Sequence, residues 1–150
     1  MISDISIIDK AWLAGFIDGE GYIGLVKQIK PTGGLRYHPQ VVITSTDEKI
    51  IEEIQILIPI AKRAFLRRTE GHKLGFQLKI VKYQHLSEFL EPIKPYLRLK
   101  GRQAELIMEF CRLRKETKII TGRGSKGKTS FGIVDEQIYQ ELSKLNKRGV

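Results

Sequence analysis

The order of hydrophobic and polar residues along the chain predicts a helix followed by two strands at the N-terminus. A helix is expected from about Asp9, a plausible N-cap, to Gly19 or Gly21, where glycine can end it. Residues 22–30 and 36–44 alternate between apolar and polar, as strands do, and a segment rich in proline and glycine separates them. This part of the chain is therefore expected to form a helix and a β-hairpin.

The next part of the chain repeats that order. Residues 45–47, with the sequence Ser-Thr-Asp, resemble a helix start, and isoleucine and leucine then recur at helical spacing until Pro59. Residues 62–69 and 74–81 alternate well enough to form a second hairpin. Two helix-strand-strand units are therefore expected in succession.

The remaining sequence predicts three more helices and one long loop. The helices are expected over about residues 84–91, 101–115 and 135–146, and a loop rich in Gly, Lys and Thr over about 117–130. The resulting helix-strand-strand-helix-strand-strand-helix order predicts an α+β fold with one antiparallel four-stranded sheet, helices on one face, and an additional C-terminal helix. A single domain is expected over residues 1–150, with its core over about 8–115.

Composition and charge indicate the kind of partner. The chain has 150 residues, with 26 Lys and Arg against 17 Asp and Glu, a formal net charge of +9. A surplus of that size favours a polyanion such as nucleic acid. No apolar run approaches the ~18 residues of a membrane span, and the N-terminus lacks the pattern of a secretory signal. We therefore expect an intracellular protein that has neither a membrane nor a small molecule as its partner.

Cysteine and charge placement narrow the chemistry further. Cys111 is the single cysteine, so an internal disulfide and a cysteine-rich zinc site are excluded. Residues 1–21 carry four acids against Lys10 alone, whereas residues 61–82 carry seven Lys and Arg and one acid, Glu70. An acidic N-terminal element thus lies within a basic protein.

The first predicted helix has a stripe of small residues. Ala11, Gly15 and Gly19 recur at intervals of four, beside an apolar stripe that includes Leu13. Glycine costs up to about 1 kcal/mol in a helix interior, so this spacing suggests that another backbone approaches closely. That backbone could belong to the same chain or to a second one.

Two carboxylates lie at the C-terminal end of this helix. Asp18 and Glu20 occupy a position where the helix dipole and the free carbonyls are already negative, so a cation is expected there. Mg²⁺ prefers oxygen ligands, often takes only one or two carboxylates, and could also use the carbonyl of Gly19. The alternative is that the two acids are solvated or paired with Lys or Arg.

The segment that contains these residues resembles a known motif. Residues 13–21, Leu-Ala-Gly-Phe-Ile-Asp-Gly-Glu-Gly, resemble the signature of the LAGLIDADG homing endonucleases. The order of elements and residues 95–104, Pro-Tyr-Leu-Arg-Leu-Lys-Gly-Arg-Gln-Ala, are also similar to that family, which extends the resemblance over about the first 115 residues. The resemblance implies a site-specific, metal-dependent double-strand DNA endonuclease, the product of an intron- or intein-associated mobile element.

The resemblance also assigns roles to residues. Glu20 matches the metal-binding acid of the motif, where many members have Asp, and its ion would be Mg²⁺, with Mn²⁺ or Ca²⁺ able to occupy the same site. Asp18 matches a position that is usually structural. Lys100 matches a lysine that in some members lies beside the scissile phosphates, although it could be an ordinary surface lysine. Ser45 and Lys49 stand where some relatives have a water-ordering Gln and a basic residue; Ser45 could equally be an N-cap.

The motif occurs once in this chain, which implies a homodimer. By resemblance, two copies of the first helix pair about a two-fold axis and bring two Glu20 carboxylates side by side. The target would then be a long, roughly palindromic DNA cut across its minor groove. The residues expected in the dimer interface are Ala11, Leu13, Gly15 and Gly19. An RNA-binding intron maturase and a DNA-binding regulator without cleavage are the alternative functions.

Strand alternation predicts which sheet surface reads DNA. The polar set expected to face DNA consists of Gln28, Lys30, Arg36, His38, Gln40, Arg67, Thr69, Gln77 and Lys79. The set expected to face the core consists of Ile23, Leu25, Ile29, Tyr37, Val41, Ile43, Leu66, Phe76, Leu78 and Ile80. Arg and Lys can bind guanine and Gln can bind adenine in the major groove, and the basic loop could bind phosphates. An ordinary solvated sheet face is the alternative, and Lys27 does not fit the alternation.

Overall fold

The structure is a computed structural model that describes residues 2–65, 75–121 and 131–147. Its elements in chain order are η1 (Ile2–Asp4), α1 (Ile7–Glu20), β1 (Gly21–Ile29), β2 (Leu35–Ser45), α2 (Glu48–Leu57), β3 (Lys62–Phe65), β4 (Phe76–Ile80), α3 (Tyr83–Ile93), η2 (Lys94–Tyr96), α4 (Gly101–Thr121) and α5 (Ile133–Asn146). The predicted order of helices and strands and the α+β class are confirmed.

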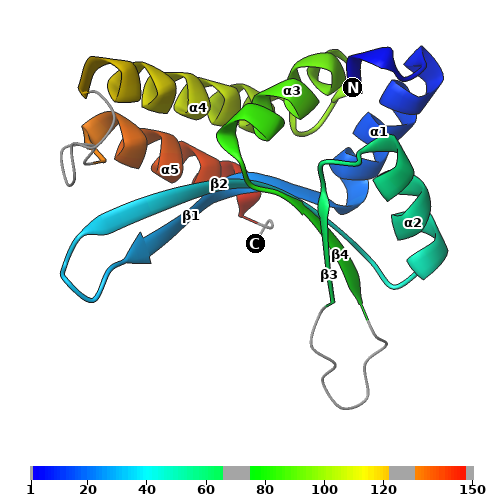
Figure 1. Cartoon of the computed structure of the whole chain (residues 1–150), viewed down its shortest axis with the longest axis horizontal. Coiled ribbons are helices and arrows are strands. Elements are labelled where there is room, and N and C mark those ends of the chain that lie inside the picture. Colours follow the sequence, from blue (N-terminus) through cyan, green and yellow to red (C-terminus); the bar gives the residue numbers. More distant parts are fainter. Residues whose placement is uncertain (1, 66–74, 122–130, 148–150) are drawn as a thin grey trace.

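The four strands form one antiparallel sheet in the order β1-β2-β4-β3. The two hairpins join where residues 41–45 of β2 pair with residues 76–80 of β4. Figure 1 shows the helices gathered over one face of this sheet, while both hairpins bend away from them toward their tips. The sheet therefore has one face covered by helices and one open, concave face.

The core lies between the covered face of the sheet and the helices. It is one cluster to which α1, α2, α3, α4, α5, β1, β2 and β4 contribute buried side chains. The predicted inward residues that are buried are Ile23, Leu25, Tyr37, Val41, Ile43, Phe76, Leu78 and Ile80. Ile29 was placed wrongly: its side chain is 72% exposed, because it lies near the tip of the first hairpin. Leu66 lies outside the described residues.

The start of α1 differs from the prediction, whereas the N-cap of α2 lies within the predicted segment 45–47. Ser6, not Asp9, is the N-cap of α1: its Oγ accepts a hydrogen bond from Asp9 N at 3.1 Å and donates to Asp9 Oδ2 at 2.9 Å. For α2 the N-cap is Asp47, which accepts from Ile50 N at 3.3 Å. Ser45 is therefore not an N-cap; it ends β2, and its hydroxyl accepts from Asp47 N at 3.0 Å. Both caps are residues with a short oxygen-bearing side chain that can reach a free N–H of the first turn.

The later helices are longer than their sequence signals suggest. α3 includes Pro92 in its last turn, where the missing N–H removes one hydrogen bond from a helix that ends directly afterwards. α4 continues to Thr121, so the start of the predicted loop over residues 117–130 is helical, and the rest of it lies outside the described residues. None of the helices in the described part of the chain has an apolar stretch long enough to cross a bilayer.

Lys27, which did not fit the alternation, is explained by a contact with α5. Its side chain lies on the helix-covered face, where Nζ donates to Glu136 Oε1 at 3.0 Å and lies 5.3 Å from the centre of the Tyr139 ring. Glu136 also accepts hydrogen bonds from the hydroxyl of Tyr37 and from Gln140 Nε2, the latter at 2.9 Å. The C-terminal helix thus supplies the partner that an inward-facing lysine requires.

This cluster predicts a pH dependence of stability. Hydrogen bonds from Tyr37, Gln140 and Lys27 lower the pKa of Glu136 from its ordinary 4.5 to about 2. Because the pKa is lower in the folded protein, the ionised carboxylate stabilises the fold fully above about pH 4.5, and this contribution is lost as the pH falls toward 2. Glu136→Gln should therefore flatten the decline of the unfolding free energy between pH 4.5 and 2, measured by urea denaturation. The exposed Glu91 of α3 provides the control: Glu91→Gln should keep the wild-type slope, and an unchanged slope in Glu136→Gln would contradict the assignment.

Candidate active site and nucleic-acid interface

The candidate site is the turn in which α1 passes directly into β1. The helix ends at Glu20, and Gly21 N–H closes it with a hydrogen bond to the carbonyl of Ile17. A Cβ at Gly21 would lie only 2.9 Å from backbone atoms of Ile17, which is closer than real side chains approach. Glycine is therefore required there, and it lets the strand leave the helix immediately after the acid of the motif.

Asp18 is an anchor for the segment that precedes α4. Its two carboxylate oxygens accept hydrogen bonds from three successive backbone N–H groups: Arg98 at 2.8 Å, Leu99 at 3.1 Å and Lys100 at 3.0 Å. Hydrogen bonds from backbone N–H groups to a carboxylate are charge-assisted and stronger than neutral ones. This geometry agrees with the structural role that the sequence resemblance implied for Asp18.

Lys100 returns the contact to the end of α1. Its Nζ donates to the carbonyls of Ile17 at 2.9 Å, Asp18 at 3.0 Å and Gly21 at 2.7 Å. The ammonium group has three N–H donors, and the last carbonyls of a helix have no partner within the helix. Lys100 is thus the cation that the negative end of α1 was expected to attract, and this part of the expectation does not require a metal.

Glu20 differs from Asp18 in that its carboxylate is available. The residue is exposed, and among the described residues it makes no hydrogen bond and no ion pair. Gly19 is exposed as well, and its carbonyl is not one of the three that Lys100 binds. No group of three His, Cys, Asp or Glu side chains in the described part of the chain could hold a metal. Within the described residues, the turn at the end of α1 therefore offers the carboxylate of Glu20 without a partner, which suits an ion such as Mg²⁺ that keeps several waters.

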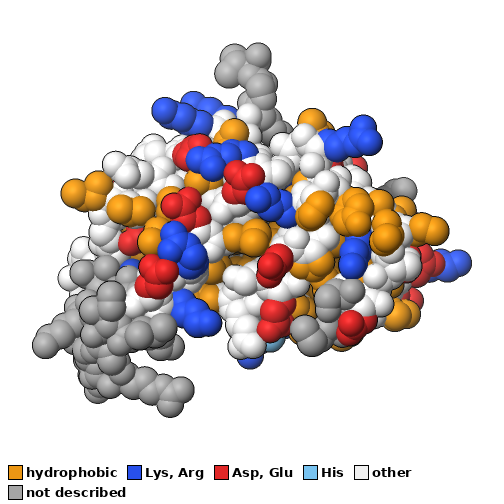
Figure 2. All heavy atoms as spheres, turned by 90° about the horizontal axis from the view of Figure 1, so that it is seen from above, with side chains coloured by type: hydrophobic (Ala, Val, Ile, Leu, Met, Phe, Trp, Pro, Cys, Tyr) orange, Lys and Arg blue, Asp and Glu red, His pale blue; other side chains and the backbone are white. Residues whose placement is uncertain are grey.

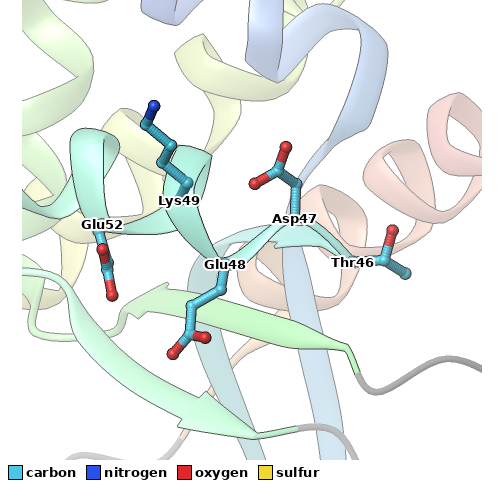
Figure 3. A pocket seen from close by; sticks show the side chains of 5 residues that line it. All are labelled: Thr46, Asp47, Glu48, Lys49 and Glu52. Carbon is cyan, nitrogen blue, oxygen red and sulfur yellow. The ribbon is translucent and has the colours of Figure 1, made fainter.

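Ser45 and Lys49 lie at the junction of β2 and α2. Lys49 lines an open surface hollow of about 630 Å³ at the start of this helix (Figure 3), whose lining residues are Thr46, Asp47, Glu48, Lys49 and Glu52. Figure 3 shows the Lys49 side chain directed away from Glu48 and Glu52. Within the described residues neither Ser45 nor Lys49 is bonded to Glu20, so a catalytic role for them stays a prediction.

The open face of the sheet collects most of the predicted DNA-reading residues. Cross-strand partners in an antiparallel sheet point to the same side, and the register pairs Gln28 with Arg36 and Val42 with Lys79. The described candidates that share this face by register are Gln28, Arg36, His38, Gln40, Gln77 and Lys79. Lys30 follows β1 in the hairpin turn and is exposed. Arg67 and Thr69 lie outside the described residues.

Lys62 belongs to the same face and was missed from the sequence. It is exposed at the start of β3, and its cross-strand partner is Lys79 of β4. Two like charges directly opposite each other destabilise a sheet, and a bound polyanion relieves that repulsion. Alternation counted back from the predicted inward Leu66 puts Lys62 on the covered face, but the residue that lies there is Arg63, which pairs with Glu48 of α2.

One residue predicted for the dimer interface, Leu13, is buried in the core of the single chain. Leu13 is fully buried in the core, so it cannot contact a second chain, and its assignment to the dimer interface is wrong. Ala11, Gly15 and Gly19 are exposed, as that assignment requires. A Cβ built on Gly15 or Gly19 would have no atom within 4 Å, so nothing in the described chain fills the space beside these glycines.

The exposed surface of α1 is also apolar. Ile7, Ile8 and Trp12 are 67%, 80% and 40% exposed, respectively, and they lie on the first turns of the helix that carries Gly15 and Gly19. Figure 2 shows hydrophobic side chains gathered on the side of the molecule where Figure 1 places α1 and α2. Contiguous exposed apolar surface of this kind is typical of a face that another protein covers.

Two proteins of known activity are similar to this chain in sequence. The DNA endonuclease I-CvuI of Chlorella vulgaris is 30% identical over 112 residues, which cover 72% of this chain and 66% of that protein. The DNA endonuclease I-CreI of Chlamydomonas reinhardtii is 30% identical over 109 residues, which cover 66% of this chain and 60% of that protein. The chain thus spans slightly less than two thirds of the curated relatives that it matches. No family model matches the chain.

Solved structures share the fold. The archaeal intron-encoded homing endonuclease I-Vdi141I, complexed with DNA, has a TM-score of 0.72 and 19% identity over 95% of this chain and 87% of that chain. I-CvuI, in complex with DNA in the presence of Mg, has a TM-score of 0.60 and 22% identity over 95% of this chain and 97% of that chain. With its signature at the end of α1, its relatives at 30% identity and its shared fold, the chain belongs to the LAGLIDADG homing endonuclease family.

Proposed function

We propose that this protein is a metal-dependent, site-specific double-strand DNA endonuclease that acts as a homodimer. The observation that carries the proposal is the exposed carboxylate of Glu20, which has no partner among the described residues and lies in a turn that Asp18 and Lys100 fix from both sides. A regulator without cleavage or an RNA-binding protein would not need an acid at this position. The two curated relatives are DNA endonucleases, which supports the same activity.

Glu20 and the carbonyl of Gly19 would hold a divalent cation, for which we propose Mg²⁺, with Mn²⁺ or Ca²⁺ as possible substitutes. The fit rests on a hard oxygen donor set that no described side chain occupies. When bound, such an ion lowers the pKa of water and stabilises negative charge on a phosphodiester. Asp18 and Lys100 position the turn, so that the Glu20 carboxylate is presented in one orientation at the start of β1.

A second copy of the chain completes the site. The exposed face of α1 carries the small residues Ala11, Gly15 and Gly19. Because their side chains take little space, the same face of another α1 could approach closely. Such a two-fold contact would bring the second Glu20 near the first, with one carboxylate for each DNA strand. It would also cover the exposed Ile8 and Trp12. Two-fold symmetry in turn favours a roughly palindromic target, cut across one groove.

The open face of the sheet would bind the DNA. Because α1 runs directly into β1, the free carboxylate lies where the polar face begins. Arg36 and Lys79 are suited to guanine and to phosphates, and Gln28 and Gln77 to adenine. Lys62, which opposes Lys79, adds positive charge to this surface. The net charge of +9 would strengthen binding and make it dependent on salt concentration.

Glu20→Gln should abolish DNA cleavage and preserve DNA binding. The amide keeps the size of the side chain but removes the charge that a divalent cation requires, and Glu20 has no described hydrogen bond whose loss would unfold the turn. Cleavage of a target selected from random DNA should fall at least about 10³-fold with Mg²⁺, since the catalytic ion is lost. Binding measured by gel shift in Ca²⁺-free buffer should change less than about threefold. A wild-type protein that binds DNA but cuts none with Mg²⁺ or Mn²⁺ would favour a regulator instead, and promotion of intron splicing would favour a maturase.

Gly15→Leu should separate the dimer without unfolding the chain. Space around Gly15 is open within one chain, and leucine is favoured over glycine in a helix by about 0.8 kcal/mol, so the monomer should be at least as stable as before. Between two closely packed helices the same side chain would act as a wedge. Sedimentation should show monomers, and cleavage of both strands should be lost. A variant that still sediments as an active dimer would refute the pairing of α1 helices.

Lys100→Met should lower both stability and cleavage. The substitution keeps most of the stem but leaves the carbonyls of Ile17, Asp18 and Gly21 without their charged donor, at a cost of about 2–4 kcal/mol of unfolding free energy. A lysine that acts only on phosphates would affect cleavage and not stability. Urea denaturation together with the cleavage rate separates these roles, and an unchanged midpoint would show that the bonds to the carbonyls contribute nothing. Arg98→Met, at the neighbouring exposed position, is the matched control.

A further inference from the structure

The distal part of the β1–β2 hairpin, residues 24–29 and 35–40, is a ribbon of two strands. β1 pairs with β2 along its whole length, but β4 pairs with β2 only from Val41 to Ser45. In the described residues, the part of β2 before Val41 therefore has β1 as its sole strand neighbour. Two strands alone are only marginally stable in water. The orientation of this ribbon must be set by what packs against its covered face.

The carboxylate of Glu136, on α5, binds both strands of the ribbon on that face. Glu136 accepts a hydrogen bond from the hydroxyl of Tyr37. It accepts another from Lys27, whose Nζ lies 3.0 Å from Glu136 Oε1. Lys27 and Tyr37 are cross-strand partners, so Glu136 holds both strands at one rung of the ladder. That contact joins residues 99 and 109 positions apart in the chain.

The Lys27–Tyr37 pair lies directly between two cross-strand pairs that carry polar residues of the open face. On one side Val26 is paired with His38, and on the other Gln28 is paired with Arg36. Successive side chains of a strand point to opposite faces, so Glu136 acts behind the surface on which Gln28, Arg36 and His38 are displayed. The side chains of Gln28 and His38 are hydrogen-bonded to each other at 3.0 Å and would move together with the ribbon.

The helix that carries Glu136 is itself held to the rest of the molecule. Asp135 lies 3.8 Å from Arg114 of α4, whose guanidinium stacks 4.0 Å from the centre of the Phe131 ring. Further along α5, Glu141 accepts from Arg102 Nε at 2.9 Å. α4 in turn begins directly after the segment that Asp18 binds. A series of side-chain contacts therefore connects the turn of Glu20 with the ribbon through α4 and α5.

We propose that Glu136 is a positioning residue that sets the angle of the β1–β2 ribbon and thereby determines the base preference of Gln28, Arg36 and His38. The inference rests on the proposed function, since it assumes that the open face of the sheet reads DNA. Glu136 cannot act by touching the bases, because its contacts are on the helix-covered face. Its loss should therefore affect only the base pairs that the ribbon reads.

The test compares specificity at each position of the target. A target is selected from a random DNA library with the wild-type protein, and binding is measured for every single-base substitution of it. Gln28→Ala identifies the base pairs read by the ribbon, and Gln77→Ala those read by β4. Glu136→Gln and Tyr37→Phe each weaken the contact between α5 and the ribbon, and Tyr37→Phe keeps the ring in the core. Glu141→Gln is the matched control, because it removes an ion pair of the same helix that does not involve the ribbon.

Glu136→Gln and Tyr37→Phe should each reduce discrimination at the ribbon positions about fivefold, against a cost of roughly tenfold or more for a full mismatch, and leave the β4 positions unchanged. The double variant should resemble Glu136→Gln alone, because the bond from Tyr37 is one of the contacts that Glu136 makes. Glu141→Gln should keep the wild-type profile. An equal loss of affinity at all positions, or an unaltered profile in both variants, would overturn the proposal. If the wild-type protein selects no DNA at all, the proposed function fails before Glu136 is tested.

Discussion

The reciprocal contact between Asp18 and Lys100 joins the end of α1 to the segment before α4 and fixes the turn that carries Glu20. The carboxylate of Asp18 binds the backbone of residues 98–100, and the ammonium of Lys100 binds the carbonyls at the end of α1. Each group binds backbone atoms at the end of an element, and the two elements lie about 80 residues apart in the chain. α1, β1 and the start of α4 are thereby joined at one point, and Glu20 lies beside it.

The division of labour within the motif follows from this contact. Two acids separated by one residue have opposite environments, since Asp18 is saturated by N–H donors and Glu20 is exposed without a described partner. A bound cation would therefore meet Glu20 and not Asp18. The same helix presents its small residues outward, so the surface proposed for dimer contact and the proposed metal ligand lie on one short segment. A change in helix pairing would consequently move the carboxylate.

The two faces of the sheet have separate tasks that the alternation of side chains makes possible. The covered face holds the core together with the Glu136 cluster, and the open face collects polar and basic residues from β1, β2, β3 and β4. Lys62 opposite Lys79 shows that this surface is not arranged for the stability of the free protein. α5, which lies beyond the two helix-strand-strand units, contacts the covered side of the ribbon through Glu136.

The element order, the α+β class, the motif and most of the inward and outward positions can be predicted from the sequence alone. These depend on local signals: periodicity, caps, turns and a contiguous segment of nine residues. Four features depend on long-range packing: the strand order β1-β2-β4-β3, the burial of Leu13, the partner of Lys27 and the role of Lys100 at the end of α1. The physical reason is that each of these depends on a group far away in the chain: Glu136 for Lys27, the last carbonyls of α1 for Lys100, and the packed helices for Leu13. No local pattern carries that information, because the sequence does not tell whether a charged or apolar side chain is solvated or contacts a distant helix.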